Sequence, residues 1–145
     1  MGFGQSDCES KIQSLYDDFH KEKDPTGKGA HDMGAKLDVG KAPIFRGVLD
    51  YFPRALKAVS EVSLAGSKKY AWKSCLEVPN GFERYSDAMG RHILAEATDG
   101  LYDDGPGGTG CLHAAQVAWN ALIRLELLII ELEKQVKPPS DSGTK

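Results

Sequence analysis

Residues 112–136 read LHAAQVAWNALIRLELLIIELEKQV, and this stretch decides the fold class. Its apolar residues recur at helical spacing, so we expect one long helix, which Lys137-Pro138-Pro139 ends. These apolar residues form two stripes on different sides of the helix. The first stripe comprises Ala118, Leu122, Leu125, Ile129 and Leu132, and the second comprises Ile123, Leu127 and Ile130.

Two apolar stripes on one helix predict that the helix packs against two different surfaces. One stripe can form the core of the protomer, and the other then needs cover. A partner subunit that packs helix against helix is the simplest cover, so we expect a homo-oligomer. The alternative is a single thick stripe inside one bundle.

Three further helices are expected upstream. They cover residues 6–23, residues 48–70 and residues 82–99. The second tolerates Pro53 only if this residue lies in the first turn, and Asn80 is a candidate N-cap for the third. No segment alternates like a strand. The sequence therefore predicts an all-α helical bundle.

Composition and length limit what this protein can be. The chain has 145 residues, 41% hydrophobic and 27% charged, which suits one globular domain. With 18 Lys and Arg against 21 Asp and Glu, its net charge of −3 argues against stable nucleic-acid binding. No apolar run approaches the length that crosses a membrane, and three scattered cysteines without CxxC spacing suggest a reduced, cytoplasmic protein.

Two glycine-rich loops divide the chain. Residues 24–43 predict a long loop, kept either for flexibility or for contacts with a ligand. Residues 105–110 match GxGxxG, but no strand precedes them, so the pattern argues against a dinucleotide-binding fold. A loop that leads into a helix N-terminus can still offer backbone N–H groups to an anion. We expect an N-terminal helix and loop over 1–35, the main domain over 36–136 and a disordered tail over 137–145.

The third helix carries polar groups beside its expected buried face. That face is formed by Phe82, Tyr85, Met89 and Ile93, and Arg91 points away from it. A buried carboxylate is costly unless it is paired or bound to a metal. The polar groups on the same side or its edge are His92, Glu96 and Asp99.

The last helix repeats this pattern. His113, Gln116 and Asn120 share one face above apolar Ile123 and Leu127. Two facing helices with such stripes can form a metal or ligand site. An ordinary buried hydrogen-bond network, with His113 as a helix cap, is the alternative.

The loop between these two helices contains Asp103 and Asp104. Both could reach the same region and add oxygen ligands suited to Mg²⁺ or Mn²⁺. Turn formation, for which aspartate before glycine is common, is an equally good explanation.

Cations and aromatic rings suited to a nucleotide occur elsewhere in the chain. Lysines can hold phosphates and aromatic rings can stack a base, although loop lysines are often only solvated and a tryptophan often fills a core. The candidate substrate-binding residues are Lys36, Asp38 and Lys41 in the long loop, and Lys69, Tyr70 and Trp72 after the second helix.

Several separated motifs occur in the order typical of one known family. They are KLDVGK at 36–41, GSKKY at 66–70 with Trp72, Arg91-His92, TGCLH at 109–113 and AWNAL at 118–122. From about Lys36 to Glu131 the chain resembles the dATP/dGTP diphosphohydrolase domain of phages and bacteria. This domain is similar to the MazG-like all-α nucleoside triphosphate pyrophosphohydrolases, and its branch includes the phage proteins called MazZ.

The resemblance implies a metal-dependent reaction on a dimeric or tetrameric scaffold. A purine (deoxy)nucleoside triphosphate would be cut to the monophosphate and pyrophosphate, with Mg²⁺ or Mn²⁺ as cofactor. The implied metal ligands are His92, Glu96, Asp99, Asp103, Asp104 and His113. Glu96 and His92 would be catalytic, with Lys41 and Lys69 neutralising the pyrophosphate and Arg91 and Asn120 binding the nucleotide.

The sequence departs from the MazG pattern of ExxE on one helix and ExxD on the next. The corresponding helices offer His92 with EATD at 96–99, and then HAAQ at 113–116. Nearer relatives often have HxxH at the last position, which Gln116 replaces. Two other functions stay open: a nucleotide-binding sensor without catalysis, and a purely structural helical oligomer.

Overall fold

The computed structural model describes Ser10 and residues 23–136, and this part of the chain is helical. Its helices are α2 (Pro53–Ser67), α3 (Gly81–Thr98) and α4 (His113–Val136), with a π-helical turn η1 (Phe45–Leu49) and a 3₁₀ turn η2 (Ser74–Glu77). Within the described residues no strand forms, and one isolated antiparallel bridge joins Tyr102 and Leu112. The predicted all-α class is confirmed.

The chain divides into two compact units, with the boundary between Tyr51 and Phe52. The first unit contains the long loop and η1, and the second contains α2, η2, α3 and α4. The expected helix over 6–23 lies outside the described residues except for Ser10 and Lys23, and so does the tail over 137–145. The division at residues 35 and 136 stays a prediction.

Pro53 sets the start of α2. The helix was expected from Val48 but begins at Pro53, and Phe52 before it takes φ −127° and ψ 38°. Proline disfavours helical conformation in the residue that precedes it, and its missing N–H costs nothing in the first turn. The placement of Pro53 in the first turn is therefore confirmed, whereas the earlier start was wrong.

Asn80 occupies the N-cap position of α3 but makes no side-chain cap hydrogen bond. Its backbone is left-handed, with φ 53° and ψ 37°, while a capping side chain normally requires an extended backbone. The predicted position is correct and the predicted capping interaction is wrong. α3 then runs to Thr98, one residue short of the expected end.

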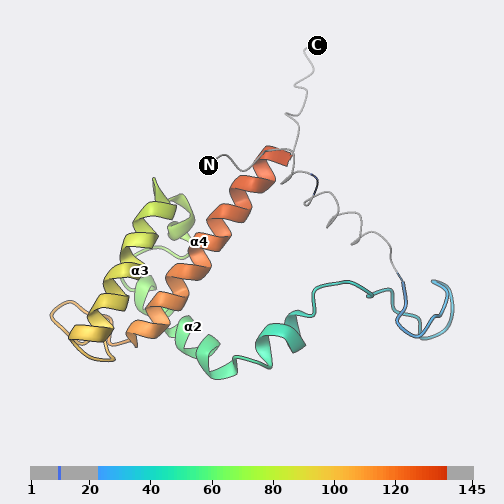
Figure 1. Cartoon of the computed structure of the whole chain (residues 1–145), viewed down its shortest axis with the longest axis horizontal. Helices are drawn as coiled ribbons and strands as arrows, with labels where there is room; N and C mark the ends of the chain where they lie inside the picture. Colours follow the sequence, from blue (N-terminus) through green and yellow to red (C-terminus); the bar gives the residue numbers. More distant parts are fainter. Residues whose placement is uncertain (1–9, 11–22, 137–145) are drawn as a thin grey trace, which may run out of the picture. The chain divides into compact units, whose positions relative to one another are not determined.

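α3 and α4 form the main helix pair of the second unit, and α2 packs against α4 (Figure 1). The two helices run antiparallel, since His92 near the end of α3 contacts His113 at the start of α4. Between α2 and α4, the Trp119 Nε1–H donates to Ser63 Oγ at 2.8 Å. The Trp119 ring also meets the ring of Tyr85 edge-on, with centroids 5.8 Å apart.

The face of α3 that packs on α4 differs from the expected one. Tyr85 and Met89 are half-buried as predicted, but Phe82 is 45% exposed and Ile93 is 52% exposed. Helical spacing alone does not decide how far a helix is rotated toward its neighbour. Here the contact with α4 is centred on the side that carries His92, and Phe82 and Ile93 lie at its edge.

The two apolar stripes of α4 have different surroundings in the described chain. Ile123 is buried, and Leu127 and Ile130 are half-buried, so the second stripe forms the protomer core. The other side of the helix is exposed in the part of the chain that the structure describes. Its exposed residues are Leu122 at 50%, Leu125 at 52%, Leu128 at 45% and Ile129 at 41%.

A search of the described helices finds none with the length and apolar character that crossing a membrane requires.

Candidate functional site

Two histidines meet where α3 and α4 come together. The Nδ1 atoms of His92 and His113 lie 3.0 Å apart, and the ring centroids are 5.3 Å apart with planes tilted by 38°. His113 is buried and His92 is half-buried. When both rings are neutral, this contact requires a proton on one Nδ1 and a lone pair on the other.

Burial favours the neutral form of His92. It is the largest cause that lowers the pKa of His92, and His113 and Arg91 lower it further against the opposing effect of the Asp103 carboxylate. His92 is therefore a neutral imidazole at pH 7. A neutral ring can accept a proton or bind a metal ion.

Asp103 organises the loop that joins the two helices. Its Oδ2 accepts hydrogen bonds from the Thr109 N–H at 2.9 Å, the Thr109 hydroxyl at 2.9 Å and the Gln116 amide at 3.0 Å. Its backbone N–H donates to the Cys111 carbonyl, and its carbonyl accepts from the Gly110 N–H. Asp103 thus closes the glycine-rich loop and ties it to the first turns of α4. These hydrogen bonds agree with the explanation that Asp103 serves in turn formation.

The Asp103 carboxylate makes the stability of the protein pH-dependent. Burial alone would raise its pKa, but the hydrogen bonds from Gln116 and Thr109, with His92 nearby, lower it below the ordinary value of 3.8. A lowered pKa gives a contribution to stability that is complete above 3.8 and is lost as the pH falls through the folded-state value. We expect Asp103→Asn to melt at a lower temperature than the wild type at pH 7, and the difference to shrink toward pH 3. A gap that stays constant from pH 7 to pH 3 would contradict this role.

Gly108 allows the loop to close on Asp103. A Cβ at position 108 would lie 2.2 Å from the Asp103 carbonyl oxygen, whereas a Cβ at Gly105 would meet nothing within 4 Å. We expect Gly108→Ala to destabilise the protein by about 1–3 kcal/mol, because backbone has to move. Gly105→Ala is the matched control and should leave the melting temperature unchanged. Equal melting curves for the two variants would show that the loop closes differently.

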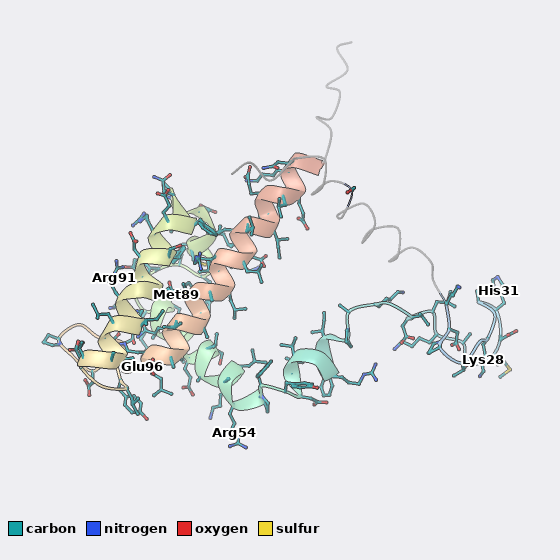
Figure 2. The ribbon with its side chains drawn as sticks, viewed as in Figure 1. Lys28, His31, Arg54, Met89, Arg91 and Glu96 are labelled. Atoms are coloured by element: carbon teal, nitrogen blue, oxygen red, sulfur yellow. The ribbon has the colours of Figure 1, made fainter. Side chains whose placement is uncertain are left out.

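The predicted acidic ligands are not gathered around the histidines. Glu96 is half-buried, one turn beyond His92 on α3 (Figure 2), while Asp99 and Asp104 are exposed. No three His, Cys, Asp or Glu side chains converge as a metal site within the part of the chain that the structure describes. The structure thus brings His92 and His113 into contact. The Asp103 carboxylate lies close enough to affect the pKa of His92.

The polar residues of α4 take part in a buried hydrogen-bond network. Gln116 is buried, and its amide donates to Asp103 and also to the Thr109 hydroxyl at 3.0 Å. Asn120 is 5% exposed, and its amide donates to the Gln116 carbonyl at 2.7 Å. The expected stripe is confirmed as a buried polar layer, with Thr109 as a member that spacing on the helix could not reveal.

Apart from Asn120, which is buried, the candidate substrate-binding residues of the second unit lie at the surface. Lys69 donates from Nζ to the Gly107 carbonyl at 3.1 Å, which places this cation at the glycine-rich loop. Tyr70 is 69% exposed and Trp72 67% exposed, so Trp72 fills no core in the described chain. Arg91 is exposed on α3, as expected (Figure 2).

Lys36, Asp38 and Lys41 belong to the first unit. The Lys36 Nζ lies 3.7 Å from the Asp38 carboxylate. The Lys36 backbone N–H donates to buried Asp24 at 2.6 Å, a hydrogen bond that is the main cause lowering the Asp24 pKa to about 2. This network shapes the long loop.

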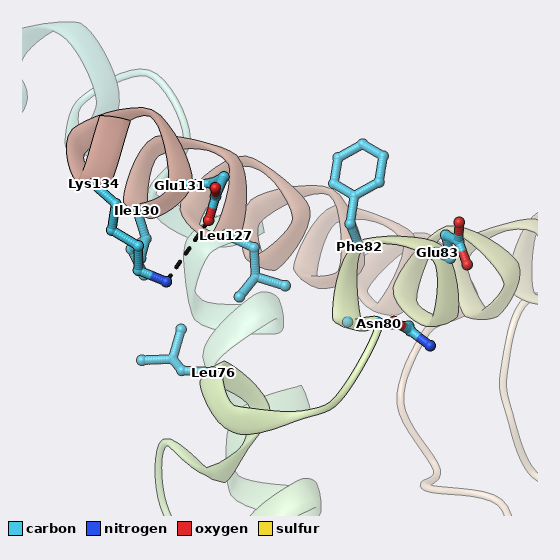
Figure 3. Close-up of a pocket in the computed structure, with 9 residues that line it drawn as sticks. Leu76, Asn80, Phe82, Glu83, Leu127, Ile130, Glu131 and Lys134 are labelled. Atoms are coloured by element: carbon cyan, nitrogen blue, oxygen red, sulfur yellow. Dashed lines mark ion pairs between the residues drawn. The ribbon is translucent and has the colours of Figure 1, made fainter. Parts of the chain in front are cut away.

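A pocket of about 370 Å³ lies at the opposite end of the helix pair (Figure 3). Leu76, Phe82 and Leu127 line it, and the ion pair between Lys134 and Glu131, 3.7 Å apart, borders it. Its lining has neither histidine nor a glycine-rich loop. We therefore assign the candidate site to the histidine pair and not to this pocket.

Arg124 is a further residue that helical spacing did not single out. It is half-buried on α4, and its guanidinium carbon lies 4.6 Å from the centre of the Phe82 ring on α3. The one signal in the sequence is a lone arginine within an apolar stretch of the last helix.

Comparison with known families gives one match. A family model described as dATP/dGTP diphosphohydrolase, N-terminal, matches residues 31–137. The matched range contains both histidines, the glycine-rich loop and all three helices of the second unit. No curated protein and no solved structure matches the chain.

Proposed function

Because the chain belongs to the dATP/dGTP diphosphohydrolase N-terminal family, we propose that it hydrolyses a purine deoxynucleoside triphosphate. Water would attack the α-phosphorus, the bond to the β-phosphate would break, and the products would be the monophosphate and pyrophosphate. We place this reaction at the histidine pair, because His92 Nδ1 and His113 Nδ1 lie 3.0 Å apart beside the loop that Asp103 closes.

A divalent cofactor would be held by the lone pairs of His92 Nδ1 and His113 Nδ1, and its binding would replace the hydrogen bond between these two atoms. A bound ion would neutralise phosphate charge and lower the pKa of water. An imidazole pair is a poor ligand set for Mg²⁺, which demands near-ideal octahedral oxygen coordination, and we expect the transition ion Mn²⁺ to support higher activity.

The chain's own groups would position the substrate and move the proton. Glu96, half-buried one turn from His92, is our candidate for the base that takes the proton from the attacking water. Lys69 at the Gly107 carbonyl would hold phosphate oxygens. Asp99 and Asp104, exposed near the same loop, are candidate further metal ligands.

We also propose that the protein acts as a homo-oligomer, in which a second copy covers the exposed face of α4. This face carries four large aliphatic residues that no described part of the chain covers. The same surface on two copies is complementary to itself if their α4 helices pack across a two-fold axis.

A nucleotide-binding sensor is the second candidate function. It is favoured by the absence, in the described residues, of three converging metal-binding side chains. A sensor would bind the nucleotide without product formation in either metal.

Product analysis separates these functions. The purified protein is incubated with each dNTP and NTP in Mg²⁺ and then in Mn²⁺, and the products are separated by anion-exchange chromatography. We expect monophosphate plus pyrophosphate from dGTP or dATP. Diphosphate plus orthophosphate would contradict the proposal, and intact substrate with a raised melting temperature would identify the sensor.

A further inference from the structure

Arg124 on α4 is a half-buried cation that has no acidic partner among the described residues. No ion pair joins it to a described carboxylate, and its Nε is buried without a hydrogen-bond partner. Its Nη1 donates to the Met89 sulfur at 4.0 Å, a weak acceptor, and its guanidinium carbon lies 4.6 Å from the centre of the Phe82 ring. These neighbours hold the guanidinium but do not balance its charge. Because an arginine is rarely removed from water without a partner, we expect a carboxylate from outside the described part of the chain.

Arg124 and Glu126 border opposite edges of the exposed apolar face of α4. Helical geometry places Arg124 about 110° from the middle of this face on one side and Glu126 about 90° from it on the other. Glu126 is exposed, and no ion pair joins it to a described residue. The helix thus carries an unpaired cation at one edge of the face and an unpaired anion at the other. The face comprises Leu122, Leu125, Leu128 and Ile129.

A two-fold axis that runs along α4 would bring these two edges together. Rotation about such an axis makes the α4 helices of two copies parallel, and each edge of one face then lies against the opposite edge of the other. Equal residues lie at the same height, so Arg124 of one copy and Glu126 of the second copy are offset by about 3 Å along the helices. Packed helices lie about 8–10 Å apart, a distance that an arginine and a glutamate side chain span together.

An antiparallel pair would offer Arg124 a different carboxylate. Antiparallel packing lays like edges against each other, so Glu131 of the second copy, which shares the Arg124 edge, would be the available partner. The Glu131 Oε2 already lies 3.7 Å from Nζ of Lys134 on its own helix. Glu126 has no such partner in the part of α4 that the structure describes. Charge complementarity therefore favours Glu126 and the parallel arrangement.

We propose that Arg124 forms an ion pair with Glu126 of a second copy, once on each side of the two-fold axis, and that this pair sets the parallel packing of α4. The inference rests on the proposed homo-oligomer and is independent of the proposed hydrolysis. Charged residues that flank an apolar helix interface determine partner choice and orientation, whereas the apolar face supplies most of the affinity. The second copy thus supplies both the cover for the exposed face and the missing carboxylate.

Charge-swapped chains test this pair. Sedimentation velocity over a range of concentrations measures the dissociation constant of the oligomer for the full-length wild type, Arg124→Glu and Glu126→Arg. Each variant alone places like charges together at both pairs, so we expect its dissociation constant to rise at least about 30-fold. An equimolar mixture of the two variants restores opposite charges at both pairs and should associate like the wild type. Arg84→Glu is the control and should change nothing, because Arg84 is exposed on α3.

The variants also separate the pair from a folding defect and from the other proposals. Glu126 is exposed, so Glu126→Arg tests the pair even if Arg124→Glu does not fold. An unchanged dissociation constant for Glu126→Arg, or two folded variants that do not restore each other, would overturn the pair. Restoration of Arg124→Glu by Glu131→Arg instead would overturn the parallel arrangement.

Failure of the pair is distinguishable from failure of the proposals on which the article's function rests. A wild type that is monomeric at every concentration would remove the oligomer and the pair together. Mutual restoration by the swapped chains of a protein that hydrolyses no nucleotide would confirm the pair while the proposed hydrolysis fails.

Discussion

Replacement of His113 by alanine is expected to lower kcat by at least a hundred-fold. This histidine is buried, and its Nδ1 contacts His92 Nδ1 at 3.0 Å, so the substitution removes half of the pair at which we place the reaction. Groups that transfer protons or bind a catalytic metal contribute roughly 10²–10⁴-fold to the rate. The measurement is the initial rate of pyrophosphate release from dGTP and dATP.

Two further variants separate catalysis from folding. His113→Asn keeps a polar group in place, and its melting temperature shows whether the helix pair remains folded. His31→Ala is the control, because His31 is an exposed histidine of the first unit (Figure 2). A folded His113→Asn protein with full activity would remove the histidine pair from the mechanism.

The double variant shows whether the two histidines act together. If both serve one ion or one proton transfer, replacement of the second costs little once the first is gone. We therefore expect the loss in kcat for the His92 and His113 double variant to be close to that of the more severe single variant. Losses that multiply would indicate two independent roles.

Leu125→Glu is expected to convert the oligomer into monomers. Leu125 is 52% exposed in the described chain and lies at the centre of the uncovered face of α4. A second copy on this face would bury the new carboxylate without a partner, and loss of a central interface residue costs about 2 kcal/mol or more. Light scattering after size exclusion measures the mass.

Leu94→Glu is the matched control for the oligomer. Leu94 is also a large aliphatic residue, 65% exposed, but it lies on α3. Its mass and activity should equal those of the wild type. A wild-type protein that is monomeric, or a Leu125→Glu protein of unchanged mass, would contradict the proposed α4 contact.

Helical periodicity predicted the all-α class and the approximate extents of α3 and α4, because their apolar residues repeat over several turns. It failed at the start of α2, where one proline decides the boundary. It also misjudged the rotation of α3. Phe82 and Ile93 are exposed at the edge of the helix contact, since the packing partner and not the sequence of α3 alone sets that rotation.

The candidate site was only partly predictable. Polar residues on apolar faces indicated that His92 and His113 needed partners, and the structure shows that they contact each other. The role of Asp103 depends on a loop that folds back through Thr109 and Gln116, which no helical spacing describes. Arg124 was missed because its environment comes from Phe82 and Met89 on another helix.

Hydrolysis in ¹⁸O-labelled water tests the central claim most directly. Products from dGTP or dATP are separated after single-turnover hydrolysis and analysed by mass spectrometry. Attack on the α-phosphorus predicts one ¹⁸O atom in the deoxynucleoside monophosphate and none in pyrophosphate. Label in pyrophosphate or in orthophosphate, or no labelled product with any purine nucleotide, would contradict the account.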